Sequence, residues 1–189
     1  MPEEIRIPKQ KRSIEKKEAL KKAAVELFST KGFHNTSSNE IAKKANVSIG
    51  TFYSYFVDKK SLYEELITDL YNESLQEITI MDVSGFTSPR EFVRRYVALI
   101  LHNHEYMTAF QKEISALSLQ YDDLHELEAR ERAGAFRTFF SLLETNEQML
   151  RISDLKTTSL ILQCALESVV HEVTFYAVSY THLTLPTIA

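Results

Sequence analysis

Apolar residues recur along the chain at the spacing of amphipathic helices, and no stretch alternates apolar and polar positions for long. The pattern is clear near the N-terminus, in Leu20, Ala23, Ala24, Leu27 and Phe28. Gly and Pro number only 4 each in the 189 residues, which favours helices joined by short connections. We therefore expect an all-α protein, with helices over about 13–31, 37–44, 49–56, 58–80, 89–103, 105–120, 122–146 and 154–176.

Local signals mark the ends of the short helices near the N-terminus. Ser37 and Glu40 form an S-x-x-E capping box, and Ser48 and Asp58 are the expected N-caps of the next two helices. Asn46 lies at the turn between the second and third helices, and asparagine adopts the left-handed conformation more readily than most residues. Two short helices joined by a tight turn predict a helix-turn-helix.

The third predicted helix is dense in aromatic and hydroxyl side chains. A small core is expected from Ile41, Val47, Phe52 and Phe56. The remaining side chains of the helix then lie on other faces: Thr51, Tyr53, Ser54 and Tyr55. Gly50 costs about 1 kcal/mol of helix propensity relative to Ala, and a backbone that approaches a ligand closely would explain this cost.

Charge is unevenly distributed along the chain. Residues 1–62 contain 13 Lys and Arg against 7 Asp and Glu, whereas the remainder contains 9 against 19. This asymmetry predicts a polyanionic partner for the first region only, with a solvated lysine-rich face as the alternative. Lys59 and Lys60 stand in the first turn of the fourth helix, where a bound phosphate would favour them. The alternative there is a Lys60–Glu64 pair with Lys59 solvated.

Residues 36–62 resemble the N-terminal DNA-binding region of the tetracycline-repressor (TetR) family; they read TSSNEIAKKANVSIGTFYSYFVDKKSL. That family usually shows Thr, then Ile-Ala, Ala-Gly-Val-Ser, Gly-Thr, Tyr-x-Tyr/His-Phe and Lys-x-x-Leu. The matching residues are Thr36, Ile41, Ala42, Ala45, Val47, Ser48, Gly50, Thr51, Tyr53, Tyr55, Phe56, Lys59 and Leu62. Asn46 departs from the pattern, because Gly is usual there. The resemblance implies a dimeric, ligand-responsive transcription regulator, usually a repressor that binds a palindromic operator.

By position, the resemblance also implies which residues touch DNA: Thr36, Ser37, Ser48, Gly50, Thr51, Tyr53, Ser54, Tyr55 and Lys59. Hydroxyl groups can donate to phosphate, and Thr51 can present a hydroxyl and a methyl group to base edges. The expected domains are a basic arm over 1–12, a three-helix DNA-binding domain over 13–60, and a larger helical effector-binding and dimerisation domain over 61–177.

In the TetR family the second domain encloses a small-molecule effector and forms the dimer. The candidate residues for an effector pocket are Tyr96, His102, Tyr106, Phe110, Phe136, Phe140, Glu167 and His171, each with an ordinary core or surface role as its alternative. Their aromatic content favours an apolar or aromatic effector. The last helix carries a heptad-like stripe of candidates for a homodimer interface: Leu162, Leu166, Val169, Val173 and Tyr176.

Residues 178–189 are expected to be foreign to the protein. Val178–Thr187 reads VSYTHLTLPT, which is encoded by GTC TCT TAT ACA CAT CTG ACG CTG CCG ACG, and this DNA resembles a transposase adapter used in library preparation. A natural polar C-terminus is the alternative. If the tail is foreign, native sequence ends near Ala177, and the helix that the family usually carries after this point is missing.

Other function classes find little support in the sequence. Cys164 is the single cysteine, no run approaches the ~20 apolar residues of a membrane span, and the start MPEEIRIPKQKR is not a secretory signal. We therefore expect a cytoplasmic protein with no membrane partner. His102 and His104 are two residues apart and do not share a helix face, so no metal site is expected. No catalytic constellation or cofactor motif emerges; the alternative to a regulator is a helical module that binds polyanions without sequence specificity.

Overall fold

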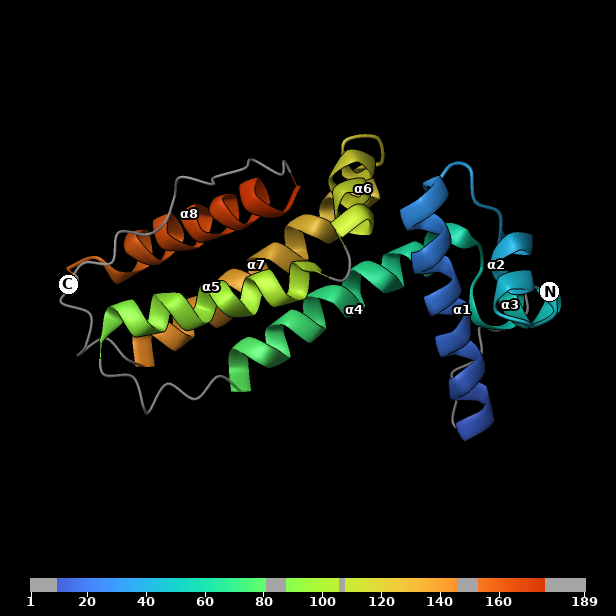
Figure 1. The fold of residues 1–189 in the computed structure, drawn as a ribbon, viewed down its shortest axis with the longest axis horizontal. Coiled ribbons are helices and arrows are strands. Elements are labelled where there is room, and N and C mark those ends of the chain that lie inside the picture. Colours follow the sequence, from blue (N-terminus) through green and yellow to red (C-terminus); the bar gives the residue numbers. More distant parts are fainter. Residues whose placement is uncertain (1–9, 81–87, 106–107, 146–152, 176–189) are drawn as a thin grey trace. The chain divides into compact units, whose positions relative to one another are not determined.

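The computed structural model describes residues 10–80, 88–105, 108–145 and 153–175, and these residues form eight helices (Figure 1). In chain order the helices are α1 (Lys11–Lys31), α2 (Ser38–Lys44), α3 (Ile49–Tyr55), α4 (Lys59–Ile80), α5 (Pro89–Glu105), α6 (Thr108–Ser118), α7 (Asp122–Thr145) and α8 (Leu155–Phe175). The all-α prediction is confirmed, and the helix ends lie within a few residues of those expected. None of the described helices combines the length and apolar character that crossing a bilayer would require.

The chain divides into two compact units. Among the described residues, unit 1 holds α1–α3, α4 as far as Leu70, α6, and α7 as far as Ala129. Unit 2 holds the rest of α4 and α7 together with α5 and α8. Three parts of the region expected to form the effector domain thus belong to unit 1: residues 61–70 of α4, α6 from Ala109, and the start of α7.

Aromatic rings fill the centre of unit 1. The ring of Tyr63 lies 5.2 Å from Phe28, 5.1 Å from Phe33 and 5.1 Å from Phe110, measured between ring centroids and at edge-on angles. Edge-to-face arrangements at these separations are favourable for aromatic pairs. Because Phe33 belongs to the loop between α1 and α2, this cluster joins that loop to α1, α4 and α6.

Charged contacts fasten α1 to α4. The ammonium group of Lys21 lies 2.9 Å from Glu65 and 2.6 Å from Asp69, and Lys17 lies 2.7 Å from Glu65. Burial lowers the pKa of Lys21, but its hydrogen bonds with Asp69 and Glu65 outweigh burial and raise that pKa overall. Lys17 and Lys21 are therefore engaged in ion pairs within the protein.

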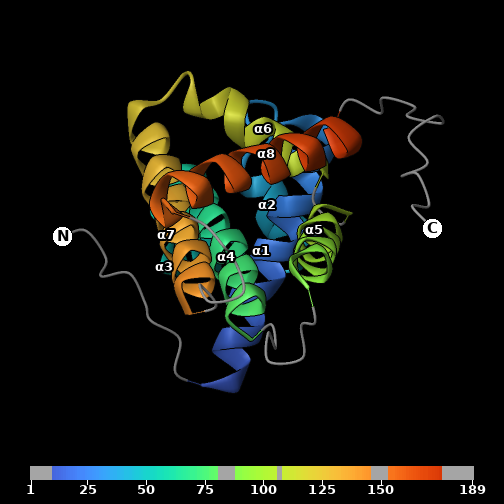
Figure 2. The same ribbon diagram turned by 90° about the vertical axis from the view of Figure 1, so that its left-hand side faces the viewer.

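Unit 2 has its own apolar core, formed by α5, α8 and the C-terminal parts of α4 and α7 (Figure 2). Its buried members are Ile78, Phe92, Tyr96, Ile100, Phe139, Leu143 and Val170. The ring of Tyr96 lies 4.7 Å from that of Phe139 between centroids, which joins α5 to α7. Val170 supplies the contact from α8 and is fully buried.

Candidate nucleic-acid interface

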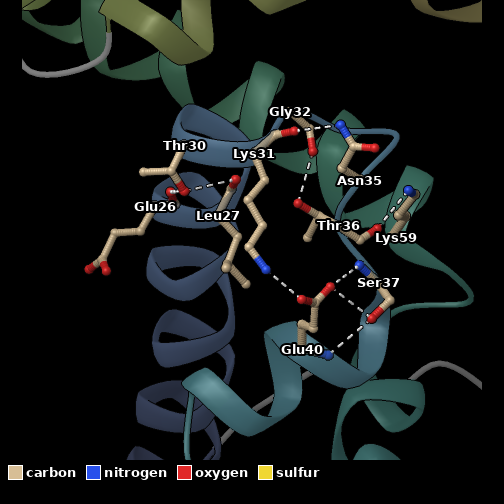
Figure 3. Close-up of polar contacts among 10 residues, drawn as sticks. All are labelled: Glu26, Leu27, Thr30, Lys31, Gly32, Asn35, Thr36, Ser37, Glu40 and Lys59. Carbon is tan, nitrogen blue, oxygen red and sulfur yellow. Dashed lines mark hydrogen bonds and ion pairs between the residues drawn. The ribbon is translucent and has the colours of Figure 1, made fainter.

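A capping box begins α2, as the sequence predicted (Figure 3). The backbone N–H of Ser37 donates to Glu40 Oε2 at 3.0 Å, and the backbone N–H of Glu40 donates to Ser37 Oγ at 3.3 Å. Lys31 at the end of α1 reaches the other oxygen of Glu40 at 2.6 Å. This lysine, followed by the donors of Ser37, lowers the pKa of Glu40 to about 2. The entry into α2 is therefore fixed by charge as well as by capping.

The turn between α2 and α3 has the predicted left-handed residue. Asn46 has a φ of 55°, and its N–H donates to the carbonyl oxygen of Lys43 at 3.1 Å. Val47 N–H then donates to Ala42 O at 3.0 Å. Ser48 caps α3 by accepting the N–H of Thr51 at 3.1 Å. These bonds fix the short turn that orients α3 against α2.

Several predicted contact residues are accessible on the resulting surface. The side chains of Ser37, Ser48 and Tyr53 are exposed, and Tyr53 retains 47% of its accessible area. Thr51 and Ser54 are half-buried: the hydroxyl of Thr51 lies 2.9 Å from that of Ser48, and Ser54 donates to Thr51 O at 2.7 Å. The exposed side of α3 therefore presents hydroxyl groups rather than charges.

Two of the predicted contact residues have buried side chains. Thr36 is 2% exposed and donates its hydroxyl to Gly32 O at 2.8 Å, which secures the loop before α2. Tyr55 is 4% exposed, and its hydroxyl lies 2.7 Å from Ser13 Oγ on α1. The expectation that Tyr55 faces away from the core is thus wrong, because the polar end of its ring finds a buried partner on another helix.

Lys59 is directed inward rather than toward solvent. Its ammonium group donates to the carbonyl oxygens of Phe33 and Thr36, the latter at 2.7 Å, and lies 4.3 Å from the centroid of the Phe33 ring. Burial lowers the pKa of Lys59. Figure 3 shows its approach to the loop before α2. This inward position differs from both expectations for Lys59, which were a lysine that binds phosphate and a lysine that is solvated.

Lys60 forms an ion pair with Asp123 at the start of α7, instead of the Lys60–Glu64 pair considered from sequence. Its ammonium group also lies 5.3 Å from the centroid of the Tyr121 ring. The hydrogen bond with Asp123 is the main cause of the raised pKa of Lys60. Both lysines of the α4 first turn therefore hold unit 1 together.

Gly50 is exposed in the first turn of α3, and the fold itself gives no reason for a glycine there. A Cβ added to Gly50 would meet only Ser48 Oγ, at an ordinary contact distance of 3.8 Å. Its φ is not in the left-handed region either, since Gly32 and Asn46 are the positive-φ residues among those described.

Two further residues on α2 can contribute to this surface. Asn39 and Lys43 were not among the DNA-contact residues predicted from the sequence, and both are exposed, one helical turn apart.

The candidate effector residues do not gather at one place. Phe110 belongs to the aromatic core of unit 1, beside Tyr63. Tyr96 is 2% exposed in the core of unit 2, where burial, followed by the charge of Glu167, raises its pKa. Phe136 and Phe140 are half-buried neighbours on α7, and Glu167 accepts a hydrogen bond from Gln163 at 2.8 Å. Tyr106 and the side chains of His102 and His171 lie outside what the structure describes.

The predicted interface stripe on α8 divides between two faces. Leu162 and Leu166 pack against the core of unit 2, whereas Val169 and Val173 are 56% and 46% exposed. Ile161 is 62% exposed and lies eight residues, about two turns, before Val169 on the same face. The exposed apolar face of α8 is therefore centred on Ile161, Val169 and Val173, and Tyr176 lies outside the described residues.

Comparison with known proteins bears directly on this arrangement. Residues 20–66, from within α1 to within α4, match the family described as bacterial regulatory proteins, tetR family. This segment of the chain is similar to the DNA-binding region of the tetR family. The match contains the whole of α2, α3 and the turns that hold them, so it covers the surface described above.

Individual relatives match the same part of the chain. The uncharacterized HTH-type transcriptional regulator YuxN of Bacillus subtilis (strain 168) is 33% identical over 89 residues, which are 47% of this chain and 30% of that protein. YdgC of the same organism, also an uncharacterized HTH-type transcriptional regulator, is 41% identical over 61 residues, 32% of this chain and 31% of its own. The chain thus spans about a third of the length of these relatives.

The fold also has solved counterparts. A structure from Mesorhizobium loti MAFF303099, assigned to TetR-family transcriptional regulators, matches with a TM-score of 0.70 at 22% sequence identity. The match covers 87% of this chain and 86% of that one. The similarity of fold therefore extends beyond the region in which sequences can be matched.

Proposed function

We propose that the protein is a transcriptional regulator that binds a specific DNA operator through α2 and α3. Gly50 is the observation that carries this proposal. It is exposed in a helix, where glycine costs up to about 1 kcal/mol, and no neighbour or backbone angle within the described protein requires it. A backbone that must lie against an external surface is the remaining physical reason for the residue.

The side chains around Gly50 have the chemistry for DNA. Ser37, Ser48 and Tyr53 are exposed hydroxyl donors suited to phosphate oxygens, and Lys43 adds an exposed positive charge. Thr51 can offer its methyl and hydroxyl groups to base edges in the major groove. Because α3 contains no Arg, Asn or Gln, base readout rests on few contacts, and we expect DNA shape to contribute to specificity.

A homodimer is the second part of the proposal. The exposed apolar face of α8 would be covered by the same face of a second copy, as is usual for a twofold interface. Two helix-turn-helix units would then read half-sites about 34–36 Å apart on a palindromic operator. By its similarity to the tetR family over residues 20–66, the protein would act in the cytoplasm as a repressor, without enzymatic activity.

Release by a small-molecule effector completes the proposal. Unit 2 is the part of the chain in which Tyr96, Phe136 and Phe140 place aromatic rings on α5 and α7. These rings would favour an apolar or aromatic effector, and binding would alter the spacing of the two recognition helices in the dimer.

Selection of binding sequences from a random duplex pool at physiological salt tests this proposal. Enrichment of an inverted repeat supports a dimeric, sequence-specific regulator, and Thr51→Ala should shift the preferred bases. Retention of duplex without any enrichment would instead favour a module that binds polyanions through charge alone, since that contact carries no sequence information.

A further inference from the structure

A half-buried glutamate joins α6 to the loop that enters the helix-turn-helix. Glu113 on α6 accepts the backbone N–H of Phe33 with Oε1. Its other oxygen, Oε2, is inaccessible to solvent and has no hydrogen-bond partner. Phe33 lies only three residues before Thr36, whose hydroxyl and carbonyl groups secure the start of α2. Glu113 is thus a direct link between α6 and the entry to α2.

The surroundings of Glu113 do not compensate a full negative charge. Phe110 and Ile114 on the same helix are buried, and the hydroxyl of Tyr63 on α4 is buried without a hydrogen-bond partner. A carboxylate with one unsatisfied oxygen in such a place is costly when ionised, and this cost is smaller when the group binds a proton and loses its charge.

Charged or titratable groups act on this carboxyl group. They are His34 from the α1–α2 loop and Lys59 from α4, and Glu113 in turn acts on the Tyr63 hydroxyl of α4, which the charge of Glu128 on α7 also reaches. Burial raises the pKa of Glu113, while the Phe33 N–H, His34 and Lys59 oppose that rise without cancelling it. Glu113 therefore binds a proton more readily when the α1–α2 loop is attached to it than when its carboxyl group lies in water.

We propose that Glu113 is a proton-responsive latch: its protonated form holds the α1–α2 loop on α6, and its ionisation weakens this attachment and loosens the entry to α2. The direction follows from linkage. A carboxyl group whose pKa is raised in the attached state favours attachment below the ordinary glutamate pKa of about 4.3, and this advantage is lost as pH rises through the raised value. Each pH unit between the two pKa values changes the attachment equilibrium by up to tenfold.

The consequence for DNA rests on the proposed function. If α2 and α3 bind an operator, the latch makes operator affinity depend on pH, because ordering of the loop before α2 becomes linked to proton uptake. The latch itself requires only unit 1 and does not depend on DNA binding, so its failure and the failure of the proposed function can be told apart.

Hydrogen exchange of the whole chain between pH 4 and 8 tests the latch, read on peptides covering residues 29–40 and corrected for intrinsic exchange rates. We expect protection of this segment to fall with rising pH in the wild type. Glu113→Gln keeps an oxygen for the Phe33 N–H and cannot ionise, so its protection should stay constant. Glu126→Gln, at an exposed site on α7 in the same unit, should behave like the wild type.

His34 needs its own control, because histidine is the residue type whose charge changes between about pH 5 and 8. His34→Gln should retain the pH dependence, and a dependence that vanishes in His34→Gln but persists in Glu113→Gln would overturn the proposal. A titration of the Glu113 side-chain carbonyl carbon by NMR in the wild type needs no variant. A midpoint at or below about 4.3 would equally contradict the latch.

Discussion

Gly50→Ala separates the stability of α3 from its proposed contact with DNA. The added methyl group would meet only Ser48 Oγ at 3.8 Å, and the backbone conformation suits any residue. Alanine should therefore stabilise the protein by about 0.5 kcal/mol, less than the ~1 kcal/mol of a helix interior because Gly50 lies in the first turn. If DNA approaches this backbone closely, the same methyl group should weaken operator binding at least about tenfold, or about 1.4 kcal/mol.

Gly134→Ala on α7 is the matched control. A Cβ at Gly134 would meet only the end of the Arg137 side chain, at 3.7 Å, so this change should also stabilise the protein, by about 0.5–1 kcal/mol. Urea unfolding at a constant m value measures both stabilities, and fluorescence anisotropy on the selected operator measures both affinities. An unchanged operator affinity of Gly50→Ala would refute the proposed close approach of DNA to this backbone. Equal losses of operator affinity in both variants would mean that the methyl group at residue 50 does not act through direct contact with DNA.

Three further predictions follow from contacts in the structure. Tyr55→Phe should lower the free energy of unfolding by about 1–3 kcal/mol, because Ser13 Oγ loses its buried partner, and should leave operator affinity per folded molecule unchanged. Tyr53→Phe should instead weaken operator binding at unchanged stability. Urea unfolding measures stability and anisotropy measures affinity, and the opposite result would restore Tyr55 as a contact residue. The pKa of Glu40 is lowered to about 2, so its stabilising contacts are fully present above the ordinary glutamate pKa near 4.3 and are lost as pH falls toward 2. Thermal unfolding between pH 2 and 7 should therefore depend less on acid in Glu40→Gln than in the wild type. Superimposable profiles would count against this role of Glu40. Val169→Glu places a charge on the exposed face of α8 and should give a monomer in sedimentation experiments, whereas an intact dimer would place the interface elsewhere.

Local signals let the sequence predict the helix-turn-helix well. The Ser37 capping box, the left-handed Asn46 and the Ser48 cap each involve partners within a few residues, so chemistry at one point in the chain determines the geometry there. The prediction fails where the partner is distant. Tyr55 pairs with Ser13, 42 residues earlier, and nothing in the pattern of α3 alone indicates that its hydroxyl is buried.

Lys59 is a second residue whose partners, distant in sequence, could not be predicted. A lysine in the first turn of a helix favours a phosphate in principle, but here two backbone carbonyls lie 23 and 26 residues upstream and accept its hydrogen bonds. On α8, periodicity alone cannot tell which side of an almost wholly apolar helix meets the core. The structure resolves this, because Leu162 and Leu166 pack inward and Ile161 and Val169 do not.

Sequence-specific recognition of DNA through α2 and α3 is the central claim, and one titration tests it most directly. The full-length protein would be titrated by fluorescence anisotropy against the selected operator and against a shuffled duplex of the same length and composition, at physiological salt. We expect the operator to bind at least about a thousandfold more tightly than the shuffled duplex. Equal affinities for the two duplexes would contradict it and would leave binding by charge alone.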